Sequence, residues 1–177
     1  MAERTKQEQQ LALIAEVATI ARETWISWWL RGGWAMEFFF GRISRPHEDI
    51  DLFIWAEDAS RFVSRLRSHG YIEREGPPPA EQRNFEKAGE ELHATFLDLN
   101  REGKVVTAGG RWDEAPWPEE MLSSAAVGRI EDIACPIIAP EAQVEIKRTM
   151  VRFRPDRTLR AKDQADIQRL RRGLSSP

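Results

Sequence analysis

The stretch RGGWAMEFFFGRISRPHEDIDLF, residues 31–53, constrains the fold of this chain more than any other segment. Two adjacent glycines precede an apolar run that ends at Gly41, and this arrangement predicts a short buried helix with a glycine near its C-terminal cap. The run DIDLFIW at 49–55 is rich in β-forming residues and predicts a strand. Residues 25–33 predict a short buried strand that stops at the glycines, so a strand, a helix and a second strand follow one another here.

Asp49 and Asp51 are separated by one residue within the second of these strands. Side chains at i and i+2 of a strand project to the same face, about 6 to 7 Å apart, so the two carboxylates point one way while Ile50 and Leu52 point into the core. Two carboxylates this close repel each other unless a cation lies between them. Oxygen ligands on a rigid strand suit Mg²⁺, which completes its shell with water and substrate phosphates. The pair therefore predicts a magnesium site.

The glycine pair, Gly32 and Gly33, complements such a site. A glycine turn lets the backbone approach a ligand closely, and the N-terminus of the following helix offers free N–H groups and the positive end of its dipole to an anion. We therefore expect phosphate groups beside the pair. Each motif alone also has a plainer interpretation, because a D-x-D triplet on an exposed strand often serves solubility and a glycine pair is often only a turn.

Two other kinds of site are excluded by the motifs. The run HEDID lacks the second histidine of an H-E-x-x-H zinc helix, so His47 is interpreted as a structural residue or a substrate-side contact. No G-x-x-x-x-G-K-[ST] motif of a P-loop is present in the sequence.

The rest of the chain continues to alternate helices and strands, with a polar, proline-rich stretch at 74–91 that predicts a loop or an extended edge. The expected helices lie over 5–23, 34–42, 58–70 with Asp58 or Ser60 as N-cap, from Pro140 onward, and over 158–172. The expected strands lie over 25–33, 49–55, 92–100, within 103–110 as a hairpin partner, and within 127–138, with a proline-punctuated loop over 112–121.

This order predicts an α/β (α+β) protein with a short mixed sheet flanked by helices. The chain has 177 residues, of which 41% are hydrophobic and 31% charged, as expected for one globular domain with a helical annex. We place the boundary near 138–140, between a core over 1–138 and a C-terminal helical part over 139–177, both packed as one compact unit.

The net charge of −3 argues against a protein that coats nucleic acid or an anionic membrane and favours a small substrate. The single cysteine, Cys135, cannot form an internal disulfide, and no apolar run approaches the roughly 20 residues needed to span a bilayer. The N-terminus lacks the basic-then-apolar plan of a secretory signal, and we expect a cytoplasmic protein.

The C-terminal part is basic although the whole chain is acidic. One interpretation is a solvated helical face with i, i+4 pairs such as Lys162 with Asp166. The other is that some of these cations, Lys147 first, reach a polyphosphate held elsewhere. Ten basic residues (Lys147, Arg148, Arg152, Arg154, Arg157, Arg160, Lys162, Arg169, Arg171 and Arg172) stand against three acidic ones (Asp156, Asp163 and Asp166).

One combination of these residues resembles the signature of small antibiotic nucleotidyltransferases, in particular the aminoglycoside 2″-adenylyltransferase and lincosamide nucleotidyltransferase group of the DNA polymerase β-like superfamily. The residues that carry it are Gly32-Gly33-Trp34-Ala35, Gly41-Arg42, Arg45, His47 and Asp49-Ile50-Asp51. Asp98 and the run KDQADIQRL at 162–170 match more loosely. The resemblance implies the polymerase β-like nucleotidyltransferase fold, with 1–138 as the nucleotidyltransferase core and helices at its C-terminus.

The resemblance also implies an activity. A nucleoside monophosphate, AMP from ATP, would pass from a magnesium-bound nucleotide to a hydroxyl of a small acceptor, an aminoglycoside-type antibiotic, while pyrophosphate leaves. Asp49, Asp51 and Asp98 would be catalytic and hold the metal, two Mg²⁺ ions that clamp the entering and leaving oxygens. Gly32 and Gly33 would lie against the triphosphate.

Single residues are candidates for nucleotide binding and for the general base. Arg42 and Lys147 join the glycine pair as nucleotide-binding candidates, although Arg42 and Arg45 are equally suited to pair with Glu48 and Glu37. Asp98 is the candidate general base, because the alternation of HATFLDL places it at the end of a face shared with Ala94 and Phe96. Its alternative role is a capping aspartate before Asn100.

Two other functions stay open. One is a nucleotidyltransferase that modifies tRNA or a protein, with the basic C-terminal helices as a docking face. The other is a non-catalytic nucleotide-binding module. The presence of both aspartates disfavours the module. The acidic net charge, together with acidic residues around the expected cleft, favours a small polycationic acceptor over a polyanion; these residues are Glu73, Glu75, Glu90, Glu91, Asp113 and Glu114.

Overall fold

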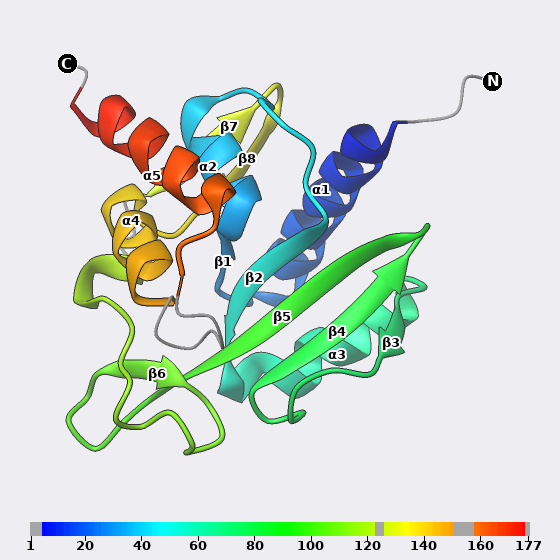
Figure 1. Ribbon diagram of the computed structural model, residues 1–177. Helices are drawn as coiled ribbons and strands as arrows, with labels where there is room; N and C mark the ends of the chain where they lie inside the picture. Colours follow the sequence, from blue (N-terminus) through cyan, green and yellow to red (C-terminus); the bar gives the residue numbers. More distant parts are fainter. Residues whose placement is uncertain (1–4, 123–125, 151–157, 176–177) are drawn as a thin grey trace.

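The computed structural model describes residues 5–122, 126–150 and 158–175 (Figure 1). Four charged residues of the basic C-terminal stretch, Arg152, Arg154, Asp156 and Arg157, lie outside the described residues. The helices are α1 (Lys6–Thr24), α2 (Gly32–Phe40), α3 (Ala59–Ser68), α4 (Pro140–Thr149) and α5 (Ala161–Leu174), with 3₁₀ turns η1 (Ala56–Asp58) and η2 (Glu119–Leu122). The strands are β1 (Trp28–Arg31), β2 (Asp49–Trp55), β3 (Ile72–Arg74), β4 (Gln82–Lys87), β5 (Glu90–Leu99), β6 (Val105–Thr107), β7 (Val127–Ile130) and β8 (Ile133–Pro136).

The main sheet is mixed. Its strands run in the order β1-β2-β5-β4-β3, and β6 pairs with the far end of β5. Only β2 and β5 are parallel, whereas β1 pairs with β2, β3 with β4, and β4 and β6 with β5 in antiparallel fashion. The strands β7 and β8 form a separate hairpin. The predicted class, a short mixed sheet flanked by helices, is confirmed.

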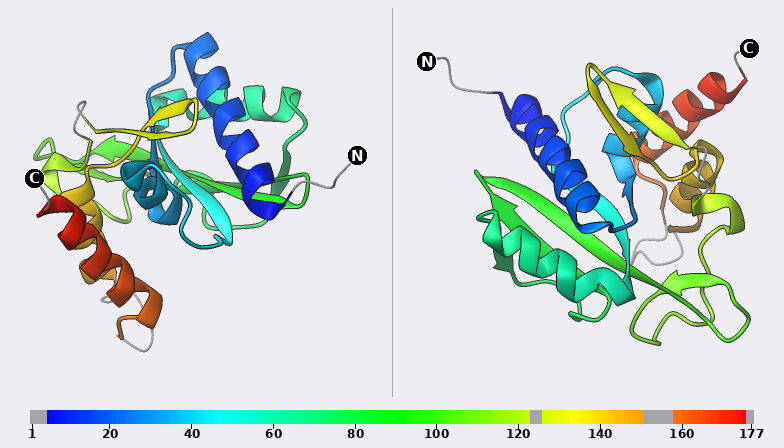
Figure 2. Two further views of the ribbon diagram at one scale, coloured as in Figure 1. Left: turned by 90° about the horizontal axis from the view of Figure 1, so that it is seen from above. Right: turned by 180° about the vertical axis from the view of Figure 1, so that it is seen from behind.

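Helices α1 and α3 cover one face of this sheet, as the rear view in Figure 2 shows. The alternation of each strand sends its apolar residues to that face, where Ile50, Leu52, Leu92, Ala94 and Phe96 are all at most 1% exposed. They pack with Ile14, Val17 and Ile20 of α1 and with Phe62 and Leu66 of α3. The prediction that Ile50 and Leu52 enter the core is therefore confirmed.

Helices α2, α4 and α5 and the β7–β8 hairpin gather beyond β1 (Figure 1). The expected glycine ends of two helices are confirmed, because Gly41 after α2 has φ 70° and Gly70 after α3 has φ 84°, values that favour glycine. The predicted boundary near 138–140 falls between β8 and α4, and α4 contacts both α2 and α5. The division into a core and a C-terminal part stays a prediction.

The proline-rich stretch 74–91 was only partly predicted. Pro77, Pro78 and Pro79 do lie outside regular structure, but Gln82–Lys87 form β4, an internal strand between β3 and β5. The expectation of a loop or an edge was wrong for these six residues. Only Phe85 among them is fully buried, so the local sequence shows no apolar alternation, and the strand depends on its pairing with β5.

No helix in the described part of the chain combines the length and the apolar composition needed to cross a membrane.

Candidate active site

Neighbouring strands place five polar side chains on one face of the sheet. Arg31 of β1 stands opposite Asp51 of β2, and Asp51 stands opposite His93 of β5. Asp49 is likewise opposite Glu91. Because residues directly opposite each other in paired strands project to the same face, these side chains share the face that α1 and α3 leave uncovered.

Asp49, Asp51 and His93 form a compact cluster of possible metal ligands. The Nδ1 atom of His93 lies 3.6 Å from Asp49 Oδ2 and 3.5 Å from Asp51 Oδ1, and one ligand atom of each residue lies within 4.8 Å of the others. The Nε2 atom of His93 lies 3.2 Å from Glu91 Oε2. The two aspartates offer the oxygen donors that Mg²⁺ prefers, and the imidazole bridges them to a third carboxylate. The residues present therefore fit a divalent cation held by the aspartates.

The two aspartates differ in their electrostatic surroundings. Burial raises the pKa of Asp51, but the hydrogen bond from His93 and the charges of Arg31 and Lys147 outweigh burial and lower it overall. Burial and the charge of Asp51 together raise the pKa of Asp49. The hydrogen bond to Asp51 is the largest influence on His93 and raises its pKa above the ordinary value despite burial. The protein thus holds Asp51 ionised, while Asp49 is the carboxylate that binds a proton more readily.

Gly32 lies against this cluster, whereas Gly33 lies against His47. Gly32 has φ +68°, and a Cβ atom on it would lie 2.9 Å from Asp51 Oδ2. A Cβ atom on Gly33 would lie only 2.2 Å from His47 Nδ1, so the imidazole occupies the space that a larger residue would need. The pair therefore lets β2 and the His47 side chain approach the start of α2 closely. No observation tests the expected contact with phosphate.

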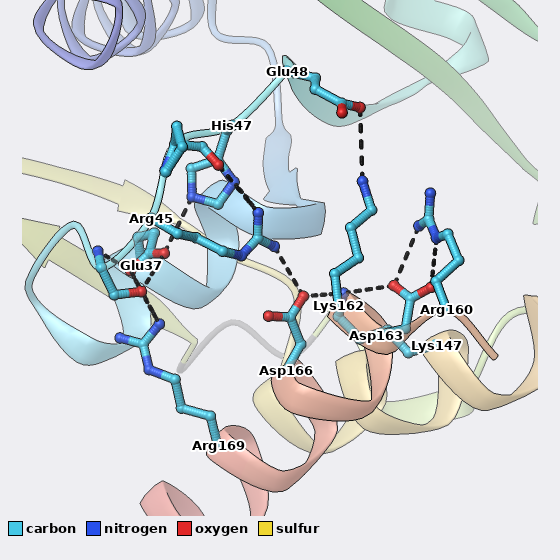
Figure 3. Close-up of polar contacts among 12 residues, drawn as sticks. Glu37, Arg45, His47, Glu48, Lys147, Arg160, Lys162, Asp163, Asp166 and Arg169 are labelled. Carbon is cyan, nitrogen blue, oxygen red and sulfur yellow. Dashed lines mark hydrogen bonds and ion pairs between the residues drawn. The ribbon is translucent and has the colours of Figure 1, made fainter.

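The loop between α2 and β2 is fixed by a buried carboxylate. Glu37 accepts hydrogen bonds from Ser44 Oγ at 2.8 Å, from Arg169 Nη1 at 3.3 Å, and pairs with His47 Nε2 at 3.1 Å (Figure 3). Burial raises the pKa of Glu37, but its bonds with His47 and Ser44 and the charge of Arg169 outweigh burial and lower it. His47 thus has the structural role that was one of its two expected roles.

Gln10 of α1 fixes the same loop from the other side. Its Nε2 donates to Glu90 Oε2 at 2.7 Å and to the carbonyl of His47 at 3.3 Å, while its Oε1 accepts from Trp34 Nε1 at 3.0 Å. The residues just before Asp49 and just before Glu91 are therefore joined through one fully buried amide side chain. This contact helps to set the register that aligns the polar residues of β2 and β5.

Helix α5 ties the cations of this region to buried carboxylates (Figure 3). Asp166, whose side chain is 5% exposed, accepts from Arg45 Nη2 at 2.9 Å and from Lys147 Nζ at 2.8 Å. Asp163 binds Arg160 Nε at 2.7 Å and lies 3.5 Å from Lys147 Nζ. These contacts replace the expected pairing of Lys162 with Asp166 and of Arg45 with Glu48 or Glu37.

Lys162 and Arg42 are both exposed at the surface. Lys162 Nζ lies 3.6 Å from Glu48 Oε2 instead of binding within its own helix. Arg42 is exposed just after α2, its backbone N–H donates to the Glu37 carbonyl at 3.2 Å, and its side chain forms no ion pair within the described ranges. Lys147, in contrast, lies close enough to lower the pKa of Asp51.

Asp98 is not brought to the carboxylate pair. It shares the α3 side of the sheet with Phe96 and lines a separate cavity with Ser60 and Val63. It also lies five residues beyond His93 on β5, about 16 Å along the strand at roughly 3.3 Å per residue. Its Oδ1 accepts the N–H of Leu99 at 2.8 Å, as a turn or capping aspartate would. Asp98 does share the face of Ala94 and Phe96, as expected. The side chains of Asp49 and Asp51 lie on the opposite face of the sheet.

The sequence interpretation missed Arg31 and His93 as members of the site, and it included Glu91 only among the acidic residues around the expected cleft. His93 carried a usable signal, because it alternates with the apolar Ala94 in the same way as Asp51 alternates with Ile50 and Leu52. Arg31 carried none, since its position opposite Asp51 depends on the pairing of β1 with β2.

A cavity of about 570 Å³ adjoins Arg31 on the same face of the sheet. Its walls come mainly from the segment between β6 and η2 and include Trp112, Trp117 and Glu114. Glu81 on its rim is already engaged, because it accepts from Arg111 at 2.8 Å and from Trp112 Nε1 at 2.9 Å. The cavity thus begins one strand away from Asp51 and offers aromatic walls with carboxylates.

Known proteins are similar to this chain in sequence. The sequence profile of the family described as Aminoglycoside-2″-adenylyltransferase matches residues 13–170. A lincosamide resistance protein of Staphylococcus haemolyticus is 26% identical over 121 residues, which are 67% of this chain and 72% of that protein. A 2″-aminoglycoside nucleotidyltransferase of Klebsiella pneumoniae is 42% identical over 43 residues, which are 24% of each chain.

Two solved structures share the fold. The lincosamide antibiotic adenylyltransferase LnuA, bound to lincomycin, aligns with a TM-score of 0.67 at 21% identity and covers 96% of this chain and 98% of its own. ANT(2″)-Ia in complex with adenylyl-2″-tobramycin aligns with a TM-score of 0.76 at 22% identity, over 94% of this chain and 90% of its own. The resemblance stated from the sequence is confirmed.

Proposed function

Because the chain belongs to the aminoglycoside-2″-adenylyltransferase family, we propose that it transfers AMP from magnesium-bound ATP to a hydroxyl group of a small antibiotic. It is a nucleotidyltransferase by family membership; the donor, the metal and the acceptor are the proposed part. One observation carries the proposal most strongly. Asp49, Asp51 and His93 converge at the end of the glycine turn, beside a cavity of about 570 Å³ that can receive an acceptor.

Asp49 and Asp51 are the residues that would hold magnesium. Bound there, the metal would neutralise charge on the transferring phosphoryl group and on the leaving pyrophosphate. His93 hydrogen-bonds Asp51 and keeps this carboxylate oriented and ionised. Glu91, beside His93 and opposite Asp49, is the exposed carboxylate that takes the role of accepting the hydroxyl proton, which the sequence had assigned to Asp98.

The triphosphate would lie along the start of α2 and toward α4. Gly32 and Gly33 begin α2, Gly32 lies against Asp51, and a helix N-terminus favours an anion. Lys147 binds Asp166, and its charge also lowers the pKa of Asp51, so it is a candidate to neutralise phosphate charge. Arg42 stays a weaker candidate for this role, since it lies exposed beyond the other end of α2.

The acceptor is proposed to be an aminoglycoside, with a lincosamide as the second candidate. The adenylylated tobramycin bound by ANT(2″)-Ia and the lincomycin bound by LnuA support these two classes, because both proteins share this fold. The carboxylates of Glu114 and Glu145 on the cavity wall suit the ammonium groups of an aminoglycoside.

A tRNA or protein acceptor receives less support. The basic residues of the C-terminal helices were the expected docking face, yet Arg160 and Arg169 each bind a carboxylate of this chain. Cations that are already paired contribute less to binding a polyanion.

The test is a transfer assay. The protein is incubated with Mg²⁺, each of the four nucleoside triphosphates, and a panel of aminoglycosides and lincosamides, and the drugs are analysed by mass spectrometry. We expect one drug class to gain the mass of one AMP group with ATP, and no gain when EDTA is added or when Asp51→Asn replaces the wild type. A folded wild-type protein that modifies no drug with any nucleotide would contradict the proposal.

A further inference from the structure

Arg31 lies between the aspartates and the cavity. It is the last residue of β1 and stands opposite Asp51, so its side chain projects to the same face of the sheet. Its guanidinium carbon lies 4.4 Å from the centre of the Phe53 ring and 5.3 Å from that of Trp117. Two aromatic rings thus hold the planar group in place without using its N–H donors.

Most of these donors have no partner in the protein. A guanidinium carries five N–H groups, yet Arg31 makes one hydrogen bond, from Nη1 to Thr95 Oγ1 at 3.4 Å, and forms no ion pair among the residues that the structure describes. Arg45, Lys147 and Arg169 behave differently, since each binds a carboxylate directly. Arg31 is half-buried and lines the cavity, so its unpaired donors can meet a ligand bound there.

The position of Arg31 indicates what this acceptor is. The cavity wall includes Arg31 and Thr95, and Asp51 lies on the adjoining strand, about 4.8 Å from β1 in the pairing direction. A group bound at both Asp51 and the cavity must pass beside Arg31. In the proposed reaction this group is the α-phosphoryl, which the acceptor in the cavity attacks.

We propose that Arg31 donates hydrogen bonds to a non-bridging oxygen of the α-phosphoryl group while it is transferred. The proposal rests on the proposed function. In the step, the oxygen of the acceptor hydroxyl forms a bond to the α-phosphorus, and the bond from this phosphorus to the oxygen shared with the β-phosphate breaks. The hydroxyl proton goes to the Glu91 carboxylate, and pyrophosphate leaves with the electron pair. Arg31 would be a catalytic residue, because its donors meet the reacting group.

Substitution of Arg31 separates this role from a structural one. Arg31→Met keeps much of the apolar stem between Phe53 and Trp117 but removes the donors, and Arg31→Lys keeps the charge but loses the fork of paired N–H groups. With the drug identified in the transfer assay, we expect kcat to fall by about 10²- to 10³-fold in Arg31→Met and less in Arg31→Lys, with KM for ATP and for the drug within about threefold. Arg61→Met, which removes an exposed arginine on α3, serves as the control and should keep the wild-type kcat.

A sulfur substitution in the nucleotide gives the decisive readout. In each of the two diastereomers of ATPαS, sulfur replaces one non-bridging oxygen of the α-phosphate. If Cd²⁺ restores the turnover of one diastereomer, the sulfur of that diastereomer occupies the position of the metal-bound oxygen. We expect the other to react about tenfold more slowly than ATP with the wild type, because sulfur accepts the guanidinium hydrogen bond poorly. In Arg31→Met this difference should disappear, since the contact is already lost. A structural role would leave it unchanged.

The outcomes are distinct. A wild-type sulfur effect in Arg31→Met, or a loss confined to KM for the drug, overturns the role of Arg31 while the proposed function stands. If Arg31→Met fails to fold, Arg31→Lys decides, because loss of the paired N–H groups should reduce the sulfur effect, whereas a structural role would leave it at the wild-type value. A wild-type protein that adenylylates no drug overturns the proposed function and this inference together.

Discussion

Two clusters of charged residues lie on either side of the loop between α2 and β2, and they differ in how their charges are matched. In the α5 cluster, Asp166 binds two cations, Arg45 and Lys147, and is nearly fully buried. On the polar face of the sheet, Asp49 and Asp51 share one histidine, and Arg31 faces a cavity with most of its donors unused. The first cluster is matched within the protein and holds the helices together, and Lys147 is the member that is also proposed to meet the nucleotide. The second has charges left for a metal, a nucleotide and an acceptor.

The largest expected effect concerns the unmatched cluster. Asp51→Asn should abolish adenylyl transfer, because a neutral amide is a poor ligand for Mg²⁺. It should leave the fold intact, because the relieved repulsion with Asp49 offsets part of the attraction to His93 and Arg31 that is lost with the charge. Transfer is followed by mass spectrometry and unfolding by urea titration, with Asp132→Asn in the exposed turn between β7 and β8 as the control. An active, folded Asp51→Asn enzyme would contradict the metal-binding role of Asp51, and with it the proposed difference between the two clusters.

The matched cluster should respond in stability. Asp166→Asn leaves Arg45 and Lys147 without their carboxylate, and we expect the free energy of unfolding at pH 7 to fall by about 2 to 3 kcal/mol, less than for a fully buried pair because Arg45 is partly exposed. Urea titration measures this loss, with Asp98→Asn as a comparison outside the cluster. If the two variants are equally stable, the α5 cluster does not support the fold as described.

The same variant has a predicted pH dependence. Burial raises the pKa of Asp166, but its hydrogen bonds and charge interactions with Lys147 and Arg45 outweigh burial and lower it below the unfolded value of about 3.9. A carboxyl group with a lowered pKa in the folded state stabilises fully above its unfolded pKa and loses this contribution as the pH falls through the folded pKa. The stability difference between wild type and Asp166→Asn should therefore be constant from pH 5 to 7 and shrink below about pH 4. A difference that grows in acid would contradict this assignment.

A smaller effect tests the packing between the two clusters. Gly33→Ala places a methyl group where the His47 ring now lies, and we expect a loss of about 1 to 3 kcal/mol in unfolding free energy. His47→Ala opens this space, so the double variant should lose less than the sum of the two single variants. Additive losses in urea titration would show that the ring does not meet the glycine.

The smallest effect is expected at Asp98. Because Asp98 lies on the α3 side of the sheet, Asp98→Asn should keep kcat within about threefold of the wild type, whereas loss of a general base costs about 10²- to 10⁴-fold. Glu91→Gln is the matched comparison and should show the larger loss. A reversal of these two results in the transfer assay would return the base role to Asp98.

The parts of the fold that could be predicted are those whose signals are local. The apolar period of α1, the Gly41 that ends α2 and the β-rich run of β2 each specify an element within a few residues. Strand β4 could not be predicted in this way, because Phe85 alone marks its buried side and the pairing with β5 supplies the rest.

The candidate site likewise contains residues that a local signal predicts and residues that only strand pairing brings there. Asp49 and Asp51 could be found because one strand carries both, whereas His93 and Arg31 join them only through strand pairing. Asp98 was correctly predicted to share a face with Ala94 and Phe96. It does not join the carboxylate pair, because that apolar face is the one that packs in the core. Lys162 and Asp166 satisfy the i, i+4 rule in sequence, yet tertiary contacts give each a different partner.

The segments that line the cavity determine how the drug specificity of the proposed enzyme can change during evolution. Trp112, Trp117 and Glu114 belong to the irregular segment between β6 and η2, whereas Asp49, Asp51 and His93 belong to paired strands. Exposed connecting segments tolerate substitutions and changes of length far better than paired strands do. In the proposed reaction, selection by a new antibiotic can therefore remodel the segment that receives the drug while the transfer chemistry is inherited unaltered, so that the resistance spectrum and the catalytic machinery evolve as separate modules of one short chain.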